Sequence, residues 1–309
     1  MDGFSVIAEA KSSFLWQGMT PEFQNVFPVK DYDLAATLTS GQAFRWKFRD
    51  GGWESVIDSR WIRLRQKENE IVAETAVAMT RWDWLENYLQ LDVNFPEIVS
   101  TFPDDEPMRT AVQSCRGLRL LRQNLWECLA SFILSSTKQI VQIQQIVARL
   151  CERFGESIAV PDRHEPAFAF PCFEKLSTVS EADLRDCKMG FRAPYLLGTA
   201  KMLTNQEVDL EKLRDCSVEP ARDELLKFPG VGNKIADCVL LFAYGFQEAF
   251  PVDVWVMKAL RELYFPKRNV KLKRLQRFSK THFGVNAGYA QQYLFHYMRT
   301  RKPVLLKTK

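Results

Sequence analysis

The sequence predicts an α+β protein that is mostly helical, in which an N-terminal antiparallel β-sheet domain precedes the helices. Three observations support this fold class. Apolar and polar residues alternate over about residues 27–75, as in strands with one buried face. From about residue 81 onward, apolar residues recur three and four positions apart, as on one face of a helix. Near residue 230 a short glycine-rich turn separates two such helical patterns, which predicts two helices joined by a tight turn.

The composition is that of an ordinary globular protein, since 46% of the 309 residues are hydrophobic and 26% are charged. The length favours two or three domains. No run of about 18 apolar residues occurs, and charged residues interrupt the N-terminal apolar stretch, so neither a transmembrane helix nor a signal peptide is expected. Seven cysteines without C-x-x-C spacing are typical of reduced thiols, and the three histidines are scattered. We expect an intracellular protein that binds no metal.

Charge is unevenly distributed along the chain. Residues 261–309 contain 13 Lys or Arg and a single acid, for a net charge of +12, whereas the first 260 residues carry a net charge of −8. A basic C-terminal part on an otherwise acidic chain suggests a polyanionic partner. On charge alone, a solvated basic helix and tail is the alternative.

The predicted strands lie in the first quarter of the chain. Phe44, Trp46 and Phe48 alternate with basic residues, the pair Gly51-Gly52 marks a turn, and the segment 71–73 closes an antiparallel meander. For Phe44 and Trp46 we expect places in the core.

The remaining elements follow from helical spacing and from helix-breaking residues. A proline-rich acidic linker at residues 102–107 separates an early helical stripe from the later helices. The spacing predicts helices over about 82–89, 139–153, 253–265 and 288–299, a turn within 187–195, and a basic segment from Lys267 to Lys280 that separates the last two helices.

The glycine turn contains the residues with the clearest chemical potential. Gly230 and Gly232 let a ligand approach the backbone, and the N–H groups at the start of the next helix suit a DNA phosphate. Lys234 follows in the first turn, where the helix dipole favours the neutral, nucleophilic amine. Asp253, 19 residues later, is expected to cap its own helix, whose dipole would keep it ionised. Plain turn chemistry, a surface lysine and an ordinary N-cap are the alternatives.

The segment 228–254, with its lysine and later aspartate, resembles the helix-hairpin-helix, Gly/Pro-Asp superfamily of base-excision DNA glycosylases, in which the lysine marks bifunctional glycosylase/abasic-site lyases. Three further segments resemble the 8-oxoguanine DNA glycosylases, and they are T-S-G-Q-A-F-R-W (39–46), G-L-R-L-L-R-Q (117–123) and G-F-R-A-P-Y (190–195). The resemblance covers about residues 25–300. We expect a β-rich domain at 1–110, a central helical lobe at 111–220, and a second lobe at 221–309 with the hairpin and the C-terminal helices.

The resemblance also implies catalytic and base-binding roles. Lys234 would attack C1′ of a flipped nucleotide and form a Schiff base, and Asp253 would stabilise the positive charge of the sugar. Cys238 and Phe295 would lie on opposite faces of the base, although on residue type alone both could simply be core. Gln291 would bind the Watson–Crick edge.

Lesion recognition is the role that the resemblance implies for Gly41. Its carbonyl would accept a hydrogen bond from N7–H, a donor that 8-oxoguanine has and guanine lacks. Double-stranded DNA containing 8-oxoguanine is therefore the expected partner, for a protein that acts as a monomer.

The DNA contacts implied by the resemblance depart from the family in part. Arg192 would contact the cytosine opposite the lesion, and Phe191 stands for the usual tyrosine wedge. Thr137 and Gln142 occupy positions at which eukaryotic members carry asparagine and a cytosine-reading arginine, so we expect weaker discrimination for cytosine. Trp255 occupies the position of a phosphate-contacting histidine.

No cofactor is expected, because no cysteine follows Cys238 and the iron–sulfur cluster of related glycosylases is therefore unavailable. Two rival functions remain open. A monofunctional alkylbase glycosylase would share the architecture, but Lys234 argues against it. A non-catalytic protein would use the hairpin only to bind DNA phosphates.

Overall fold

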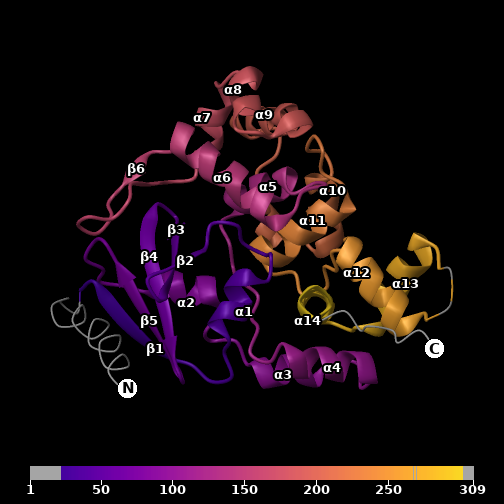
Figure 1. Cartoon of the computed structure of the whole chain (residues 1–309). Helices are drawn as coiled ribbons and strands as arrows, with labels where there is room; N and C mark the ends of the chain where they lie inside the picture. The colour runs from indigo at the N-terminus through magenta and orange to yellow at the C-terminus, as the bar shows by residue number, and fades with distance from the viewer. Residues whose placement is uncertain (1–21, 267, 269, 302–309) are drawn as a thin grey trace, which may run out of the picture.

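The computed structural model describes residues 22–266, 268 and 270–301. A five-stranded antiparallel sheet occupies one side of the molecule, and helices form the rest (Figure 1). The strands are ordered β1-β5-β4-β3-β2, so β2 to β5 form the predicted meander and β1 adds an edge strand. Their bounds are β1 (Gln24–Pro28), β2 (Lys47–Arg49), β3 (Gly52–Ile57), β4 (Arg60–Lys67) and β5 (Glu70–Thr75).

Two helices complete the core of the β-rich part. Apolar residues from the sheet pack with α1 (Leu34–Thr39) and α2 (Asp83–Leu89) into one cluster. Trp46 belongs to this cluster, and its indole N–H donates to the Tyr88 hydroxyl at 3.0 Å. Phe44 is also buried, but it packs against Phe132 of the helical core. The expectation that both aromatics are core residues is confirmed, and they join two different cores.

The helical part forms one continuous core that runs from Phe95 to Met298. In Figure 1, α7 to α9 lie at the top, α12 and α13 at the right, and α3 and α4 at the bottom. Its helices are α3 (Phe95–Ser100), α4 (Glu106–Ser114), α5 (Leu125–Leu134), α6 (Ile140–Phe154), α7 (Phe173–Ser177), α8 (Glu181–Asp186), α9 (Ala193–Thr204), α10 (Val218–Leu225), α11 (Asn233–Val239), α12 (Val254–Ala259), α13 (Leu272–His282) and α14 (Ala287–Thr300), with a short hairpin of β6 (Ser157–Ile158) and β7 (Ala167–Phe168).

The four predicted helices are present, the one at 82–89 as α2, but the prediction for the basic segment is wrong. The predicted helices at 139–153 and 288–299 correspond to α6 and α14, and the one at 253–265 corresponds to α12 with a π-helical extension over Leu260–Tyr264. The basic segment was expected only to separate helices, whereas it contains α13. Leu275 and Phe278, three residues apart, face the core, and the long basic side chains around them are good helix formers.

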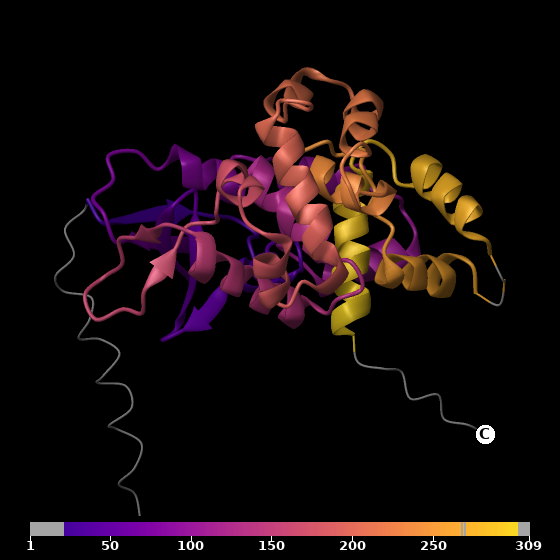
Figure 2. The ribbon, with the colours of Figure 1, turned by 90° about the horizontal axis from the view of Figure 1, so that it is seen from above.

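Helix α14 is the central element of the molecule, and it runs through the middle when the molecule is seen from above (Figure 2). Tyr289 and Tyr293 on this helix are almost completely buried. The Tyr293 hydroxyl donates to the carbonyl of Leu118 at 2.9 Å, and the Tyr289 hydroxyl accepts from the Leu120 N–H at 3.3 Å. These bonds fix α14 against the segment that connects the β-rich part to the helices.

The remaining expectations concern the domain boundaries, the N-terminal segment, the cysteines, membrane helices and metal binding. The three-part division at residues 110 and 220 stays a prediction, and the segment considered for a signal peptide lies outside the described residues. All seven cysteines are free thiols. Within the described residues, no helix is long and apolar enough to cross a membrane, and no group of three or more His, Cys, Asp or Glu could hold a metal ion.

Candidate active site

A cavity of about 840 Å³ opens between the loop that follows α1 and the helices α5, α6, α11, α12 and α14. It gathers seven of the twelve predicted site residues, although they come from positions spread over 250 residues of the chain. These are Gly41, Thr137, Lys234, Cys238, Asp253, Gln291 and Phe295. The other five, Gln142, Phe191, Arg192, Gly230 and Gly232, lie outside its walls.

The glycine turn between α10 and α11 has a strict steric requirement at Gly230. Its backbone has φ = +75°, and a Cβ would stand 2.5 Å from the ring of Tyr195 on α9. Both the left-handed backbone and the close ring therefore require glycine. Gly232 is the N-cap of α11, and both glycines are exposed to solvent. Tyr195 thus packs against one side of the turn, and the other side stays accessible to solvent.

Helix α11 presents Lys234 to the cavity from its first turn, as predicted. The Lys234 amine lies 3.4 Å from the Ser135 hydroxyl and 5.0 Å from the centre of the Phe132 ring. Among the described residues, no carboxylate forms an ion pair with this amine. A lysine that is partly enclosed and free of an ion pair can act as a nucleophile. Ser135 was not predicted as a site residue, and it has no distinctive sequence signal.

Asp253 caps α12, and its carboxylate accepts a hydrogen bond from the Val256 N–H at 2.8 Å. The predicted capping position is confirmed. Burial raises the pKa of Asp253 above the ordinary value, and the Val256 N–H and the positive charge of Lys234 oppose this shift. The start of α12 thus favours the ionised carboxylate, as expected, while burial in the cavity wall has the larger effect and determines the direction of the net pKa shift.

Cys238 lies one helical turn after Lys234 and is 3% exposed. Burial raises its pKa to about 12, so the thiol is protonated at neutral pH. The side chain belongs both to the helical core and to the cavity wall. Cys238 therefore supplies an apolar surface to the cavity instead of a thiolate nucleophile.

The loop that carries Gly41 is fixed by buried glutamines. Gln42 is completely buried, and its amide donates to the Arg119 carbonyl and accepts from the Leu121 N–H, both at 2.8 Å. Gln292 of α14 donates to the Ser40 carbonyl at 2.9 Å. These bonds hold the backbone around Gly41 from two directions. Neither glutamine was predicted to have a role, although Gln42 belongs to the T-S-G-Q segment.

One face of α14 supplies a stripe of three side chains to the cavity. Gln291, Phe295 and Arg299 follow each other at intervals of four residues, and all three line it. The Gln291 Oε1 atom is buried and has no hydrogen-bond partner among the described residues. Arg299 donates to the Thr39 carbonyl at 2.9 Å, and its guanidinium lies 5.6 Å from the Phe295 ring centre. Arg299 was not predicted, because nothing in its local sequence marks it.

The predicted DNA contacts differ in exposure. Phe191 is 52% exposed, as an inserting wedge requires. Arg192 is only 2% exposed, and its guanidinium donates to the Thr137 hydroxyl at 2.6 Å and to the Ser136 carbonyl. Thr137 has φ = +56° and lies at the surface. The structure thus connects Arg192 directly to Thr137, through a side chain that points inward.

Gln142 is exposed on the first turn of α6. Its side chain accepts a hydrogen bond from the Gln139 N–H at 3.2 Å, as part of a capping box at the start of the helix. Gln142 therefore stabilises the start of α6 in the protein without DNA.

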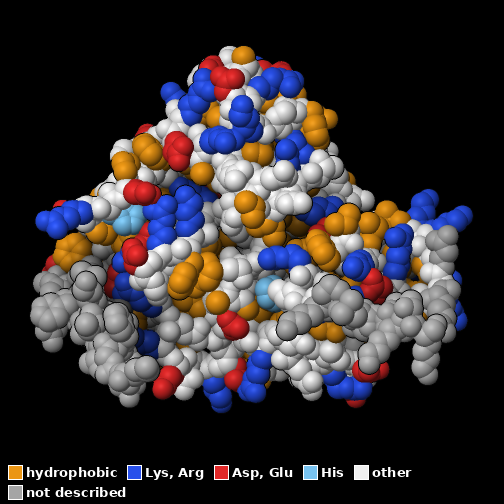
Figure 3. Space-filling model, in the orientation of Figure 1, with side chains coloured by type: hydrophobic (Ala, Val, Ile, Leu, Met, Phe, Trp, Pro, Cys, Tyr) orange, Lys and Arg blue, Asp and Glu red, His pale blue; other side chains and the backbone are white. Residues whose placement is uncertain are grey.

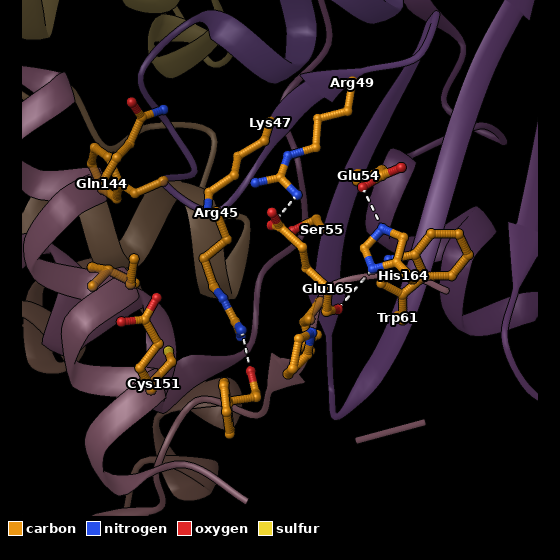
Figure 4. Close-up of a pocket in the computed structure, with 18 residues that line it drawn as sticks. Arg45, Lys47, Arg49, Glu54, Ser55, Trp61, Gln144, Cys151, His164 and Glu165 are labelled. Atoms are coloured by element: carbon orange, nitrogen blue, oxygen red, sulfur yellow. Dashed lines mark hydrogen bonds and ion pairs between the residues drawn. The ribbon is translucent and has the colours of Figure 1, made fainter. Parts of the chain in front are cut away.

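A second, smaller cavity of about 150 Å³ lies between the sheet, α6 and the β6–β7 hairpin (Figure 4). No predicted site residue lines it. Its polar side chains are largely occupied by one another, since Arg49 pairs with Glu165 at 2.5 Å and His164 contacts Glu54 at 2.8 Å. These contacts attach the hairpin to the sheet, and we assign them a structural role.

Basic side chains gather at one end of the face shown in Figure 3, where Figure 1 places α13. Five basic residues are exposed on or next to this helix, and they are Lys271, Lys273, Arg274, Arg277 and Lys280. Part of the positive charge of residues 261–309 therefore lies on the exposed face of a folded helix.

Comparison with protein-family models gives two adjacent matches. Residues 26–129 match the N-terminal domain of 8-oxoguanine DNA glycosylase, and residues 130–282 match the HhH-GPD superfamily of base-excision DNA repair proteins. The two matches meet between residues 129 and 130, within α5.

Individual relatives resemble the chain over most of its length. An N-glycosylase/DNA lyase of Saccharomyces cerevisiae is 32% identical over 85% of this chain and 82% of its own. A probable N-glycosylase/DNA lyase of Methanothermobacter thermautotrophicus is 29% identical over 88% of this chain and 95% of its own. The structure of Clostridium acetobutylicum 8-oxoguanine glycosylase/lyase, in complex with double-stranded DNA containing cytosine opposite 8-oxoguanine, has a TM-score of 0.83 at 31% identity, covering 90% of this chain and 98% of that one.

Proposed function

The chain belongs to the N-glycosylase/DNA lyase family of the HhH-GPD base-excision repair superfamily, and on this premise we propose that it excises 8-oxoguanine from duplex DNA through Lys234 and then cleaves the abasic strand by β-elimination. The observation that carries the proposal is the 840 Å³ cavity. It brings together the Lys234 amine and a helix face that bears an aromatic ring and a buried amide oxygen. Within the described part of the chain, the amine has no ion pair and the amide oxygen has no hydrogen-bond partner that would compete with a bound base.

The reaction begins with a nucleotide flipped out of the duplex into this cavity. The Lys234 amine attacks C1′, the C1′–N9 bond breaks, and its electron pair leaves with the base. Loss of a proton from the nitrogen and opening of the sugar ring give a Schiff base, which permits β-elimination of the 3′ phosphate. Asp253 contributes a carboxylate near the sugar, where a fixed negative charge stabilises the developing positive charge. The electrostatic interaction of Asp253 with Lys234 supports this arrangement.

Base recognition rests on complementary hydrogen-bonding groups. The Gln291 Oε1 atom is a buried acceptor that suits the N–H groups on the Watson–Crick edge of a guanine-type base. Phe295 supplies an aromatic surface and Cys238 an apolar one for the two faces of the base. The Gly41 carbonyl accepts from N7–H of the lesion, and guanine would leave it unpaired at a cost of about 1–3 kcal/mol.

Contacts with the rest of the duplex use the outer surface of the protein. Gly230 and Gly232 are exposed at the start of α11, where backbone N–H groups suit a phosphate. Phe191 is the apolar wedge, and Arg192 contacts the base opposite the lesion once its bond to Thr137 is exchanged for one to DNA. We propose a monomer as the acting form, because the proposed catalytic residues and those proposed to contact the flipped base line a single cavity of this chain.

Borohydride trapping tests the proposal. Reduction during reaction with duplex DNA containing 8-oxoguanine should join the wild-type chain covalently to DNA, and Lys234→Gln should abolish the adduct. Lys227→Gln is the matched control, because Lys227 lies on the same hairpin with its side chain 55% exposed and paired with Glu224. It should trap like the wild type.

The rival functions give different results in the same experiment. Release of the base without an adduct would indicate a monofunctional glycosylase. Binding to DNA with neither adduct nor base release would indicate a non-catalytic DNA-binding protein.

A further inference from the structure

Arg299 contains a polar group whose partner is missing from the described part of the chain. Its Nη1 atom is buried and finds no hydrogen-bond acceptor in residues 22–266, 268 and 270–301, whereas the neighbouring Nη2 donates to the Thr39 carbonyl at 2.9 Å. A buried donor without an acceptor costs free energy, and more so on a charged group. Because Arg299 lines the cavity, a bound ligand can supply the acceptor.

The position of Nη1 indicates which part of a ligand it would meet. This atom lies 3.1 Å from the point where a Cβ would stand on Gly41, and the Phe295 Cε1 atom lies 3.4 Å from the same point. The free donor is therefore next to Gly41 and beside the proposed stacking ring. The bond to Thr39 and the contact with the Phe295 ring hold the guanidinium in this place.

The stripe on α14 sets the direction of a bound base. Gln291 and Arg299 are eight residues apart, which corresponds to about 12 Å along the helix axis. The two side chains therefore stand at opposite ends of the stripe, with Phe295 between them. With the Watson–Crick edge at Gln291, the end of a purine that reaches Arg299 is the end that bears C8.

We propose that Arg299 is a second lesion-reading residue, whose Nη1 donates a hydrogen bond to O8 of 8-oxoguanine while the Gly41 carbonyl accepts from N7–H. The inference rests on the proposed function of the same cavity. O8 is an acceptor that guanine lacks, because guanine has C–H at this position. The lesion thus satisfies both an acceptor and a donor of the protein, and guanine satisfies neither.

Two other acceptors on a nucleotide fit the geometry less well. O6 is present in both guanine and 8-oxoguanine, and it lies on the side of the base nearer to Gln291. The phosphates are outside the plane of the base, whereas Nη1 is beside the Gly41 backbone and the Phe295 edge. The location therefore favours O8.

The experiment measures affinity for duplexes in which 2′-fluorination blocks excision. The central nucleotide is 8-oxoguanine, guanine, 8-oxoadenine or a tetrahydrofuran abasic analogue. Arg299→Met should weaken binding to 8-oxoguanine about 10- to 100-fold, the range for a hydrogen bond to a charged group. Binding to guanine and to tetrahydrofuran should change less than about threefold. The affinity for 8-oxoadenine, which keeps O8 but has no O6, should fall by the same factor as that for 8-oxoguanine.

Control variants separate base reading from structural support. Arg301→Met removes the neighbouring arginine, which pairs with Glu262, and should leave all four affinities unchanged. Arg299→Lys keeps the charge but cannot hold Thr39 and the base together, so it should lose most of the discrimination. Thermal unfolding of each variant confirms that it is folded.

Several outcomes would overturn the inference. An equal loss with all four duplexes would mean that Arg299 only supports the Gly41 loop. A loss with 8-oxoguanine but not with 8-oxoadenine would assign the contact to O6. Full discrimination in Arg299→Lys would mean that charge alone matters. Failure of the proposed function is distinct, because the wild-type chain would then form no borohydride adduct on cleavable DNA.

Discussion

Replacing Gly41 with alanine tests whether the shape of its loop determines lesion recognition. The backbone has φ = +78°, which costs an alanine about 1–2 kcal/mol relative to glycine. The new Cβ would stand 2.9 Å from the Ile140 Cδ1 atom and 3.1 Å from the Arg299 Nη1 atom, so both neighbours must move by a few tenths of an ångström. Movement of Arg299 would disturb its bond to Thr39 and the loop itself.

The expected result is a small loss of stability and a larger loss of activity. Single-turnover excision of 8-oxoguanine should fall about 10- to 100-fold, corresponding to a lost or misplaced hydrogen bond of about 1.4–3 kcal/mol. The melting temperature should fall by about 2–6 °C. Binding to a tetrahydrofuran duplex, which has no base to read, should change little.

Gly51→Ala is the matched control for this experiment. Gly51 has φ = +74°, and no atom of the described residues lies within 4 Å of its Cβ position, so alanine there brings the same backbone strain without the contacts. Its melting temperature should fall to a similar extent while excision stays at the wild-type rate. Wild-type excision by Gly41→Ala, or an equal loss in both variants, would refute the reasoning.

Two further predictions concern charge in the cavity and the opposite strand. Asp253→Asn should abolish most excision yet raise the melting temperature at pH 7, because the Asn oxygen can still cap α12 and the buried charge is removed. The raised pKa of Asp253 means that the folded state binds more protons than the unfolded one, so wild-type stability falls as pH rises through that window, and the advantage of Asp253→Asn should disappear at acid pH. Asp253→Ala, which loses the cap, should be about 1 kcal/mol less stable than Asp253→Asn. If thermal unfolding shows Asp253→Ala to be the more stable of the two, this account is contradicted. Excision rates of 8-oxoguanine placed opposite C, A, G and T should lie within about tenfold of one another, because Thr137 and Gln142 replace residues that read the opposite base in relatives. A strict preference for C would contradict the prediction.

The parts of the fold that the sequence predicts well are those determined by local patterns. Alternation of apolar residues located the sheet, and two glycines between helical patterns located the hairpin that presents Lys234. The capping position of Asp253 followed from its place before an apolar helical pattern. In each case the deciding interactions lie within a few residues, so a single sequence contains them.

Features that depend on distant contacts were missed. Helix α13 was overlooked because its basic residues conceal the two apolar positions that attach it to the core. The inward orientation of Arg192 depends on carbonyl and hydroxyl groups of a loop more than 50 residues away. Arg299 acquires its position from Thr39, 260 residues earlier, and no local pattern predicts such a pair.

Catalysis and lesion reading therefore depend on different kinds of structure in this protein. The position of Lys234 is determined by α11 and by a turn with its own steric requirements at Gly230. The position of Gly41 is determined by hydrogen bonds between α1, the segment around Leu121 and α14, which are far apart in the chain. The bonds that hold Gly41 are lost when the packing between α1 and α14 loosens, whereas the turn before Lys234 packs against Tyr195 of α9 and does not depend on that contact. Substitutions that weaken the contact between α1 and α14 should therefore reduce selectivity for the lesion before they reduce formation of the Schiff base.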